Sequence, residues 1–174
     1  MDKYIYIKRK VFDKDQCKGL IDLFEKSESE ENPRGYSGVY TTFNTPSTFF
    51  MKSIIEKSIK EYNNKHDFLK RLYTRWNLTP EFNIQKYLPG MAYRGEHMEH
   101  GKDYWDSKRL LGWMIYLNDV RNKGGTRWPQ QNFTSRPRVG DLYIWPASWT
   151  HSHYGIAAPK EIKYIVTGWA GMDP

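Results

Sequence analysis

The chain has 174 residues, of which 39% are hydrophobic and 16% aromatic, and its formal net charge is +7. This length suits one domain, so we expect residues 1–174 to fold as a single unit, and the apolar share excludes a largely disordered chain. No apolar run approaches the roughly 20 residues that a membrane-spanning helix needs, so we expect no membrane partner. The first residues lack the apolar stretch of a secretory signal, and the single cysteine, Cys17, cannot form an internal disulfide. Both features favour a reducing cytoplasm.

Basic residues are spread along the chain, with local runs only at 8–10 and 65–75. Proteins that bind nucleic acid usually gather such residues in one stripe or patch. The positive charge therefore indicates solvated helix faces more than a nucleic-acid partner, and it sets no oligomeric state.

The N-terminal part predicts one strand followed by helices. Residues 4–11 alternate and are rich in β-forming side chains, which predicts a strand. Asp13 can cap a helix, with Gln16 in the capping-box position. Helical spacing then predicts one apolar face, made of Cys17, Leu20, Ile21 and Phe24. Residues 27–38 are polar and contain glycine, so we expect a loop, and residues 49–76 predict one or two helices. The inward face of these helices is predicted to consist of Ile54, Ile55, Ile59 and Tyr62.

After Pro80 the pattern changes to short β-rich runs separated by glycine and proline turns. These runs lie at 81–88, 109–117, 138–145 and 163–169. Such spacing is typical of an antiparallel sandwich or barrel. We therefore predict an α+β, mainly β fold. Residues 1–80 would supply a strand and supporting helices, and residues 81–174 the β core with the functional site.

Four of the five histidines form two close pairs in the β-rich half, and the first pair brackets a carboxylate. These residues are His97 and His100 around Glu99, and His151 and His153. Residues i and i+2 of a strand point the same way, so His97 and Glu99 can face one metal ion. Two histidines and one carboxylate with open positions form the facial triad of non-haem iron(II) oxygenases. A lone His-x-Glu occurs often by chance, so the surrounding sequence has to decide.

The surrounding sequence resembles the 2-oxoglutarate/iron(II)-dependent oxygenases, in their prolyl 4-hydroxylase-like branch and especially its small phage and marine-microbe members. His97-Met98-Glu99 lies where that family has His-x-Asp. The other segments that carry the resemblance, in chain order, are 11–21 with Cys17, 86–93 (KYLPGMAY), 109–120 with Tyr116-Leu117-Asn118, Gly124-Gly125-Thr126, Gly140-Asp141-Leu142, and 163–165 with Trp169. The resemblance implies a double-stranded β-helix (jelly roll) core with supporting N-terminal helices. It also implies iron(II), 2-oxoglutarate and dioxygen as cofactor and co-substrates, with ascorbate as an optional reductant.

The resemblance also assigns roles to single residues. The family places a lysine that binds 2-oxoglutarate ten residues after its distal metal histidine, and His153 and Lys163 have that separation. His153 is therefore the expected third ligand. His151 would share its strand face as a site neighbour or a structural histidine. Tyr87 would hydrogen-bond the same carboxylate as Lys163, with Tyr93 as the alternative. Two further side chains are expected near the site: Trp169 would pack beside it, and Arg109 would either line it or form an ion pair at the sheet edge.

Two positions depart from the family pattern. Glu99 replaces the usual aspartate, which adds one methylene group, and Gly112 lies where many hydroxylases carry a threonine. The carboxylate charge is kept, but the longer side chain predicts a changed geometry.

The implied reaction is hydroxylation of a C–H bond, with a peptidyl proline as the best guess for the substrate. Free amino acids, other protein side chains and nucleic acid remain open. A cupin-type metalloenzyme that does not use 2-oxoglutarate is the rival enzyme, and a metal-free binding module is the rival non-enzyme. The aromatic stretches 36–50 and 104–105 are predicted to be lids, substrate contacts or packed loops.

Overall fold

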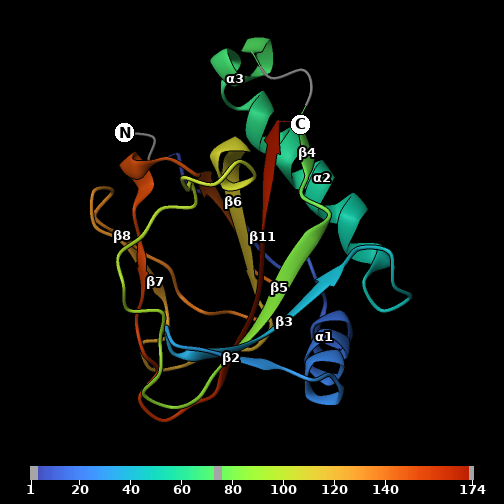
Figure 1. Ribbon diagram of the computed structural model, residues 1–174, viewed down its shortest axis with the longest axis vertical. Coiled ribbons are helices and arrows are strands. Elements are labelled where there is room, and N and C mark those ends of the chain that lie inside the picture. Colours follow the sequence, from blue (N-terminus) through green and yellow to red (C-terminus); the bar gives the residue numbers. More distant parts are fainter. Residues whose placement is uncertain (1–3, 73–75, 173–174) are drawn as a thin grey trace.

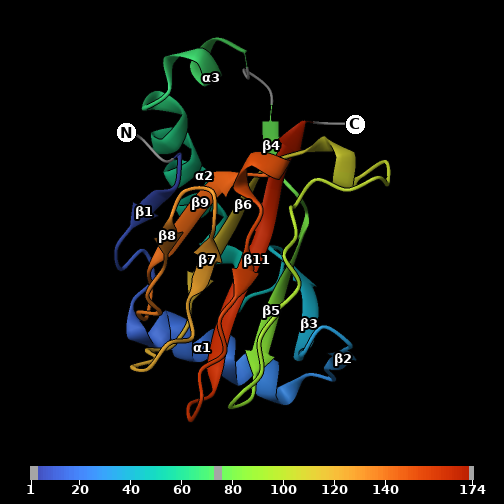
Figure 2. The ribbon, with the colours of Figure 1, turned by 90° about the vertical axis from the view of Figure 1, so that its left-hand side faces the viewer.

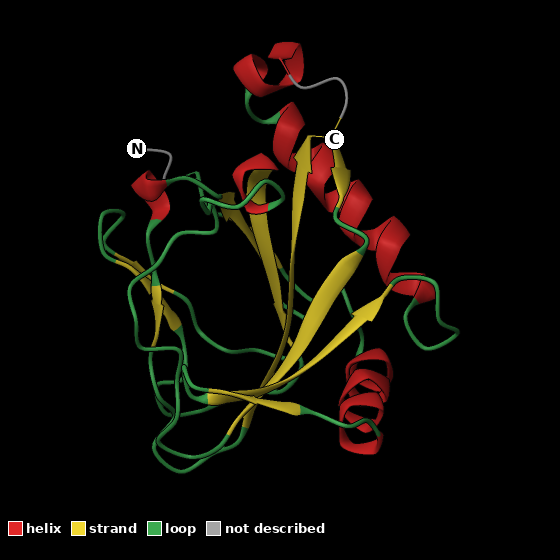
Figure 3. Cartoon of the chain, viewed as in Figure 1, coloured by secondary structure: helices red, strands yellow, loops and turns green. Residues whose placement is uncertain are grey.

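A computed structural model describes residues 4–72 and 76–172, in which the strands form two antiparallel sheets that face each other (Figures 1 and 3). The large sheet has the order β1-β9-β6-β11-β5-β3-β2, and β4 also pairs with β11. Its strands are β1 (Tyr6–Lys8), β2 (Glu30–Asn32), β3 (Tyr36–Thr42), β4 (Trp76–Leu78), β5 (Glu81–Tyr87), β6 (Arg109–Tyr116), β9 (Leu142–Pro146) and β11 (Lys163–Met172). The small sheet has the order β10-β7-β8 and consists of β7 (Thr126–Trp128), β8 (Phe133–Thr134) and β10 (Tyr154–Gly155). The predicted mainly β, jelly-roll class is confirmed.

Helices α1 (Lys14–Lys26) and α2 (Phe49–Asn64) cover one face of the large sheet, and the small sheet lies across the other face (Figure 2). The short α3 (Asp67–Leu72) follows α2, and single 3-10 turns η1 (Asp106–Lys108) and η2 (Trp149–His151) lie in loops. Among the described residues, no helix is both long and apolar enough to cross a bilayer.

Strand β6 shows how the two faces of the large sheet are built. Trp113 and Ile115 belong to the apolar cluster under the helices, whereas Met114 and Tyr116 belong to a second cluster that faces the small sheet. Successive side chains of a strand point to opposite faces. One strand therefore supplies both the core and the wall of the interior space.

Local sequence signals explain the helices. Asp13 accepts from the backbone N–H of Gln16, whose side chain accepts from the backbone of Asp13, so the predicted capping box is confirmed. The predicted apolar face of α1 is buried at Cys17, Leu20 and Phe24 and partly buried at Ile21. The predicted inward face of α2 is buried at Ile55, Ile59 and Tyr62 and partly buried at Ile54.

Four boundary predictions are wrong, and backbone turns explain three of them. The loop expected at 27–38 is the hairpin of β2 and β3, which turns at Gly35 with φ +92°. The first strand is shorter than 4–11 because Tyr4 and Lys10 have positive φ angles of 53° and 52°. The run at 138–145 becomes a strand only at β9, because Gly140 turns the chain with φ +77°. The helical region ends with α3 and the next described residues begin β4, so helices and strands are not segregated along the chain.

Candidate metal centre

The predicted ligands lie on two irregular segments that are joined by a short backbone ladder. His97 and His153 form an isolated antiparallel bridge, with N–H···O distances of 3.0 and 2.8 Å in the two directions. The backbone N–H of Glu99 donates to the carbonyl of Ala147 at 3.1 Å. Neither segment is the regular strand that was expected. The bridge instead holds the two histidine segments side by side.

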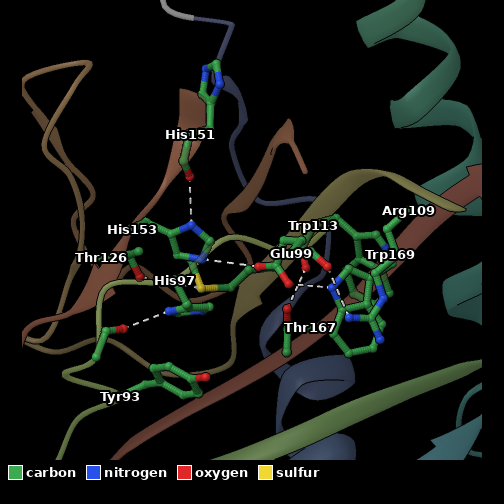
Figure 4. Close-up of polar contacts among 12 residues, drawn as sticks. Tyr93, His97, Glu99, Arg109, Trp113, Thr126, His151, His153, Thr167 and Trp169 are labelled. Atoms are coloured by element: carbon green, nitrogen blue, oxygen red, sulfur yellow. Dashed lines mark hydrogen bonds and ion pairs between the residues drawn. The ribbon is translucent and has the colours of Figure 1, made fainter. Parts of the chain in front are cut away.

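One donor atom from each of His97, Glu99 and His153 lies within 4.8 Å of the other two (Figure 4). The Nδ1 atom of His97 lies 2.9 Å from the carbonyl of Gly95, and Nδ1 of His153 lies 3.0 Å from the carbonyl of His151. A carbonyl only accepts, so each Nδ1 carries a proton, which leaves each Nε2 as the ring atom that can face a metal ion. Nε2 of His153 lies 3.1 Å from Oε1 of Glu99. These carbonyls orient both rings as metal ligands need.

Electrostatics favours the ionised form of Glu99 and the neutral form of His97. Burial raises the pKa of the Glu99 carboxyl group, but the hydrogen bond to His153 and the charges of both histidines outweigh it and bring the pKa to about 2. Burial and the neighbouring His153 lower the pKa of His97. An ionised carboxylate and a neutral imidazole are the forms in which Glu99 and His97 can bind a metal ion. The donor set of two nitrogens and one oxygen thus fits iron(II).

The second oxygen of Glu99 is held from the opposite side. Nε1 of Trp169 donates to Oε2 of Glu99 at 2.5 Å, and the guanidinium group of Arg109 lies 3.6 Å from the centre of the Trp169 ring. Arg109 also donates to the backbone carbonyl of Glu99 at 3.2 Å and pairs with Asp106 at 2.8 Å. Arg109 was expected either to line the site or to form an ion pair at the sheet edge. It does both, because the side chain that pairs with Asp106 also contacts Glu99 and Trp169.

His151 does not share a strand face with His153, and its Nδ1 lies 3.0 Å from the hydroxyl of Thr150, which agrees with the structural alternative. The residue belongs to the 3-10 turn η2 rather than to a strand shared with His153, so the two rings do not share a face. The ring of His151 points away from the cluster, and only its carbonyl faces His153 (Figure 4). Tyr93 lies beside the cluster instead, with its ring centre 4.0 Å from that of His97 and its hydroxyl in contact with Arg34.

A cavity of about 410 Å³ opens between the sheets, and its lining includes the three ligand candidates and Lys163. Lys163 is 3% exposed, and its Nζ donates to the carbonyl of Gly124 at 3.1 Å. Burial lowers its pKa to about 8, and it forms no ion pair with the described residues. Nζ also lies 4.2 Å from the ring centre of Tyr87, its cross-strand neighbour on β5. The hydroxyl of Tyr87 donates to Oε1 of Gln85 at 2.7 Å, so it is already engaged.

Several side chains of this cavity were not predicted from the sequence. They include Gln85, Met114, Thr126, Trp145 and Thr167. The signal that could have found some of them is the strand period of two. On β11, Lys163, Ile165, Thr167 and Trp169 all line the cavity. Of the aromatic stretches, Tyr36 and Tyr40 line the cavity. Tyr104 and Trp105 are exposed, and Trp105 lines a neighbouring hollow that shares Arg109 and Trp169 with the cavity.

Comparisons with known proteins agree with this geometry. The viral collagen prolyl hydroxylase of Paramecium Bursaria Chlorella virus-1, in its 2OG complex, superposes with a TM-score of 0.76, covering 98% of this chain and 97% of that chain at 19% identity. A prolyl hydroxylase of Trichoplax adhaerens, in complex with a hypoxia-inducible factor peptide fragment, superposes with a TM-score of 0.72, covering 97% and 83% at 16% identity. The chain has the fold of the prolyl hydroxylases.

Sequence comparison alone gives a weaker likeness. The probable prolyl 4-hydroxylase 9 of Arabidopsis thaliana is 23% identical over 198 residues, which cover 89% of this chain. This chain spans 64% of the length of that relative. No family model matches the sequence.

Proposed function

We propose that the chain, as one domain over residues 1–174, is an iron(II)- and 2-oxoglutarate-dependent dioxygenase that hydroxylates a C–H bond of its substrate. One observation carries the proposal: the three ligand candidates line the same cavity as Lys163, a buried lysine that has no acidic partner in residues 4–72 and 76–172. A metal site alone would also serve a cupin-type enzyme. The buried ammonium group of Lys163 can in addition pair with a carboxylate, and 2-oxoglutarate has one at the end that does not bind the metal ion.

The bound iron, 2-oxoglutarate and dioxygen would together supply the oxidising power, with succinate and carbon dioxide as by-products. His97, Glu99 and His153 would hold the metal ion from one side and leave other positions open. Lys163 would pair with the far carboxylate of 2-oxoglutarate, since an anion buried in the cavity without a cation would be costly. Within the chain, the backbone carbonyls at Gly95 and His151 keep the protons on Nδ1 of the two histidines.

For the substrate we propose a peptidyl proline. Two of the similar solved structures are named as prolyl hydroxylases, one with a peptide bound, and Tyr36 and Tyr40 bring aromatic rings to the cavity wall. Aromatic rings suit contacts with an extended, proline-containing segment. The alternatives are a free amino acid, another protein side chain or nucleic acid.

The decisive experiment incubates the purified chain with iron(II), 2-oxoglutarate, ascorbate and a proline-rich peptide, and follows both succinate formation and peptide mass. We expect succinate to form and the peptide to gain one oxygen atom. Succinate without a modified peptide would keep the oxygenase and remove the proline substrate. Metal binding without any consumption of 2-oxoglutarate would favour the cupin-type enzyme, and failure to bind metal would favour the binding module.

A further inference from the structure

We propose that Gly112 is a positioning residue, whose missing side chain makes the space in which Glu99 reaches the metal site. This inference rests on the proposed function, because it concerns the carboxylate ligand of the same site. It connects two positions that lie on different segments, one on β6 and the other in the loop before it.

Gly112 lies between two tryptophans on neighbouring strands. Its cross-strand partners are Trp169 on β11 and Trp145 on β9. A Cβ atom placed on Gly112 would lie 2.8 Å from two atoms of the Trp145 indole ring and 2.9 Å from Cγ of Glu99. Real Cβ atoms essentially never come so close to other atoms. The extra methylene of Glu99 thus occupies a notch that only a glycine leaves open.

The notch matters because both carboxylate oxygens of Glu99 are already fixed. Oε1 lies 3.1 Å from Nε2 of His153, and Oε2 accepts from Nε1 of Trp169. A side chain at position 112 would displace Cγ of Glu99. This displacement would lengthen the contact of the carboxylate with His153 or its hydrogen bond from Trp169. Gly112 therefore sets the position of the ligand without touching the metal ion or the substrate.

Gly168 on β11 provides a matched control. A Cβ atom at Gly168 would lie 2.5 and 2.8 Å from two ring atoms of Trp113 and 3.1 Å from Cβ of Phe82. Both neighbours belong to the cluster under the helices. The two glycines are thus similarly crowded by a tryptophan on opposite faces of the sheet, and only Gly112 is near Glu99.

The first test is a double-mutant cycle on thermal unfolding of the metal-free chain. Gly112→Ala should lower the melting temperature, and it should lower it clearly less when Glu99→Ala is also present, because Cγ is then gone. Gly168→Ala should lower the melting temperature equally in both backgrounds. An equal effect of Gly112→Ala in both backgrounds would overturn the proposal, since the crowding would then concern Trp145 alone. If Gly112→Ala fails to fold, folding of the Gly112→Ala/Glu99→Ala chain supports the proposal and its failure overturns it.

The second test measures binding of cobalt(II) to the same variants by absorption titration. Changes to groups that orient a metal ligand typically cost about tenfold to a hundredfold in metal affinity, and we expect a loss in this range for Gly112→Ala. Gly168→Ala should bind cobalt(II) as the unaltered chain does. Unchanged affinity in Gly112→Ala would overturn the positioning role. If the unaltered chain binds no cobalt(II), the proposed metal site fails, whereas the thermal cycle still decides the contact between Gly112 and Glu99.

Discussion

The two faces of the large sheet differ in composition although the same strands build them. The face under α1 and α2 is filled mainly by aliphatic and phenylalanine side chains, such as Phe82, Ile84 and Ile115. The face toward the small sheet is filled mainly by tyrosine and tryptophan, such as Tyr87, Tyr116 and Trp145, and borders the cavity. Figure 2 shows the helices behind the sheet and the small sheet in front of it.

Successive residues of a strand point to opposite faces, so one set of residues stabilises the core and the alternate set lines the site. Large rings fill space and carry a polar atom that can contact a ligand. Purely apolar side chains exclude water and need no partner. Alternate residues of β5, β6 and β11 can therefore serve the core and the site independently. Four predictions test how complete this division is.

The largest expected effect is on the metal ligands. His97→Ala or His153→Ala should abolish iron-dependent succinate formation while the chain stays folded, because each removes one of three ligands. The measurement is succinate yield, with circular dichroism as the check of folding. His151→Ala is the control and should keep most of the activity, because its ring points away from the cluster. Normal succinate formation in either ligand variant would remove that histidine from the site.

The next effect concerns Lys163. Lys163→Ala would leave the far carboxylate of 2-oxoglutarate buried without a partner, which costs on the order of 3–5 kcal/mol, or roughly a hundredfold or more in affinity. The measurement is titration of the anaerobic iron(II) chain with 2-oxoglutarate, following the charge-transfer absorption.

Lys86→Ala is the matched control for Lys163. Lys86 lies on the neighbouring strand β5 and pairs with Glu25, outside the cavity. The Lys86→Ala chain should bind 2-oxoglutarate with the affinity of the unaltered chain. An unchanged midpoint in Lys163→Ala would mean that another cation, such as Arg109, holds the co-substrate.

Replacing one residue on the helix-covered face should affect stability rather than binding. Ile115→Ala removes a fully buried side chain and should cost about 2–5 kcal/mol in the free energy of unfolding. Chemical denaturation measures this cost, and the affinity for 2-oxoglutarate should be unchanged. Met114→Ala, one residue away on the cavity face, should in contrast weaken 2-oxoglutarate binding. Equal effects of both variants on binding would show that the two faces are not independent.

The smallest effect is a pH dependence. Burial lowers the pKa of Lys163 to about 8, so the side chain is charged below this pH and loses its charge above it. A carboxylate needs the charged form, so affinity for 2-oxoglutarate should fall by about tenfold between pH 7 and pH 9. In Lys163→Arg the fall should disappear, because a guanidinium group stays charged throughout this range. The same fall in Lys163→Arg would assign the titration to another group.

Part of the fold could be predicted because its signals are local, whereas the candidate site residues were predicted mainly from the resemblance to a known family. The capping box at Asp13, the apolar face of α1 and the strands β5, β6 and β11 follow from the types and spacing of neighbouring residues. The hairpin of β2 and β3 could not be predicted in this way. Its residues are polar where the strand lies at the sheet edge, and its pairing with β5 joins residues 39 to 49 positions apart.

The sequence supplies two histidines and one carboxylate for a metal ion, and a lysine for the carboxylate of a co-substrate, at a recognisable spacing. Packing in three dimensions shows that the ring of His151 turns away, that Trp169 holds Glu99, and that Gly112 makes room for Glu99. The physical reason is that each of these facts depends on the side-chain directions of segments distant in sequence, and those directions are fixed by packing between sheets rather than by local preference.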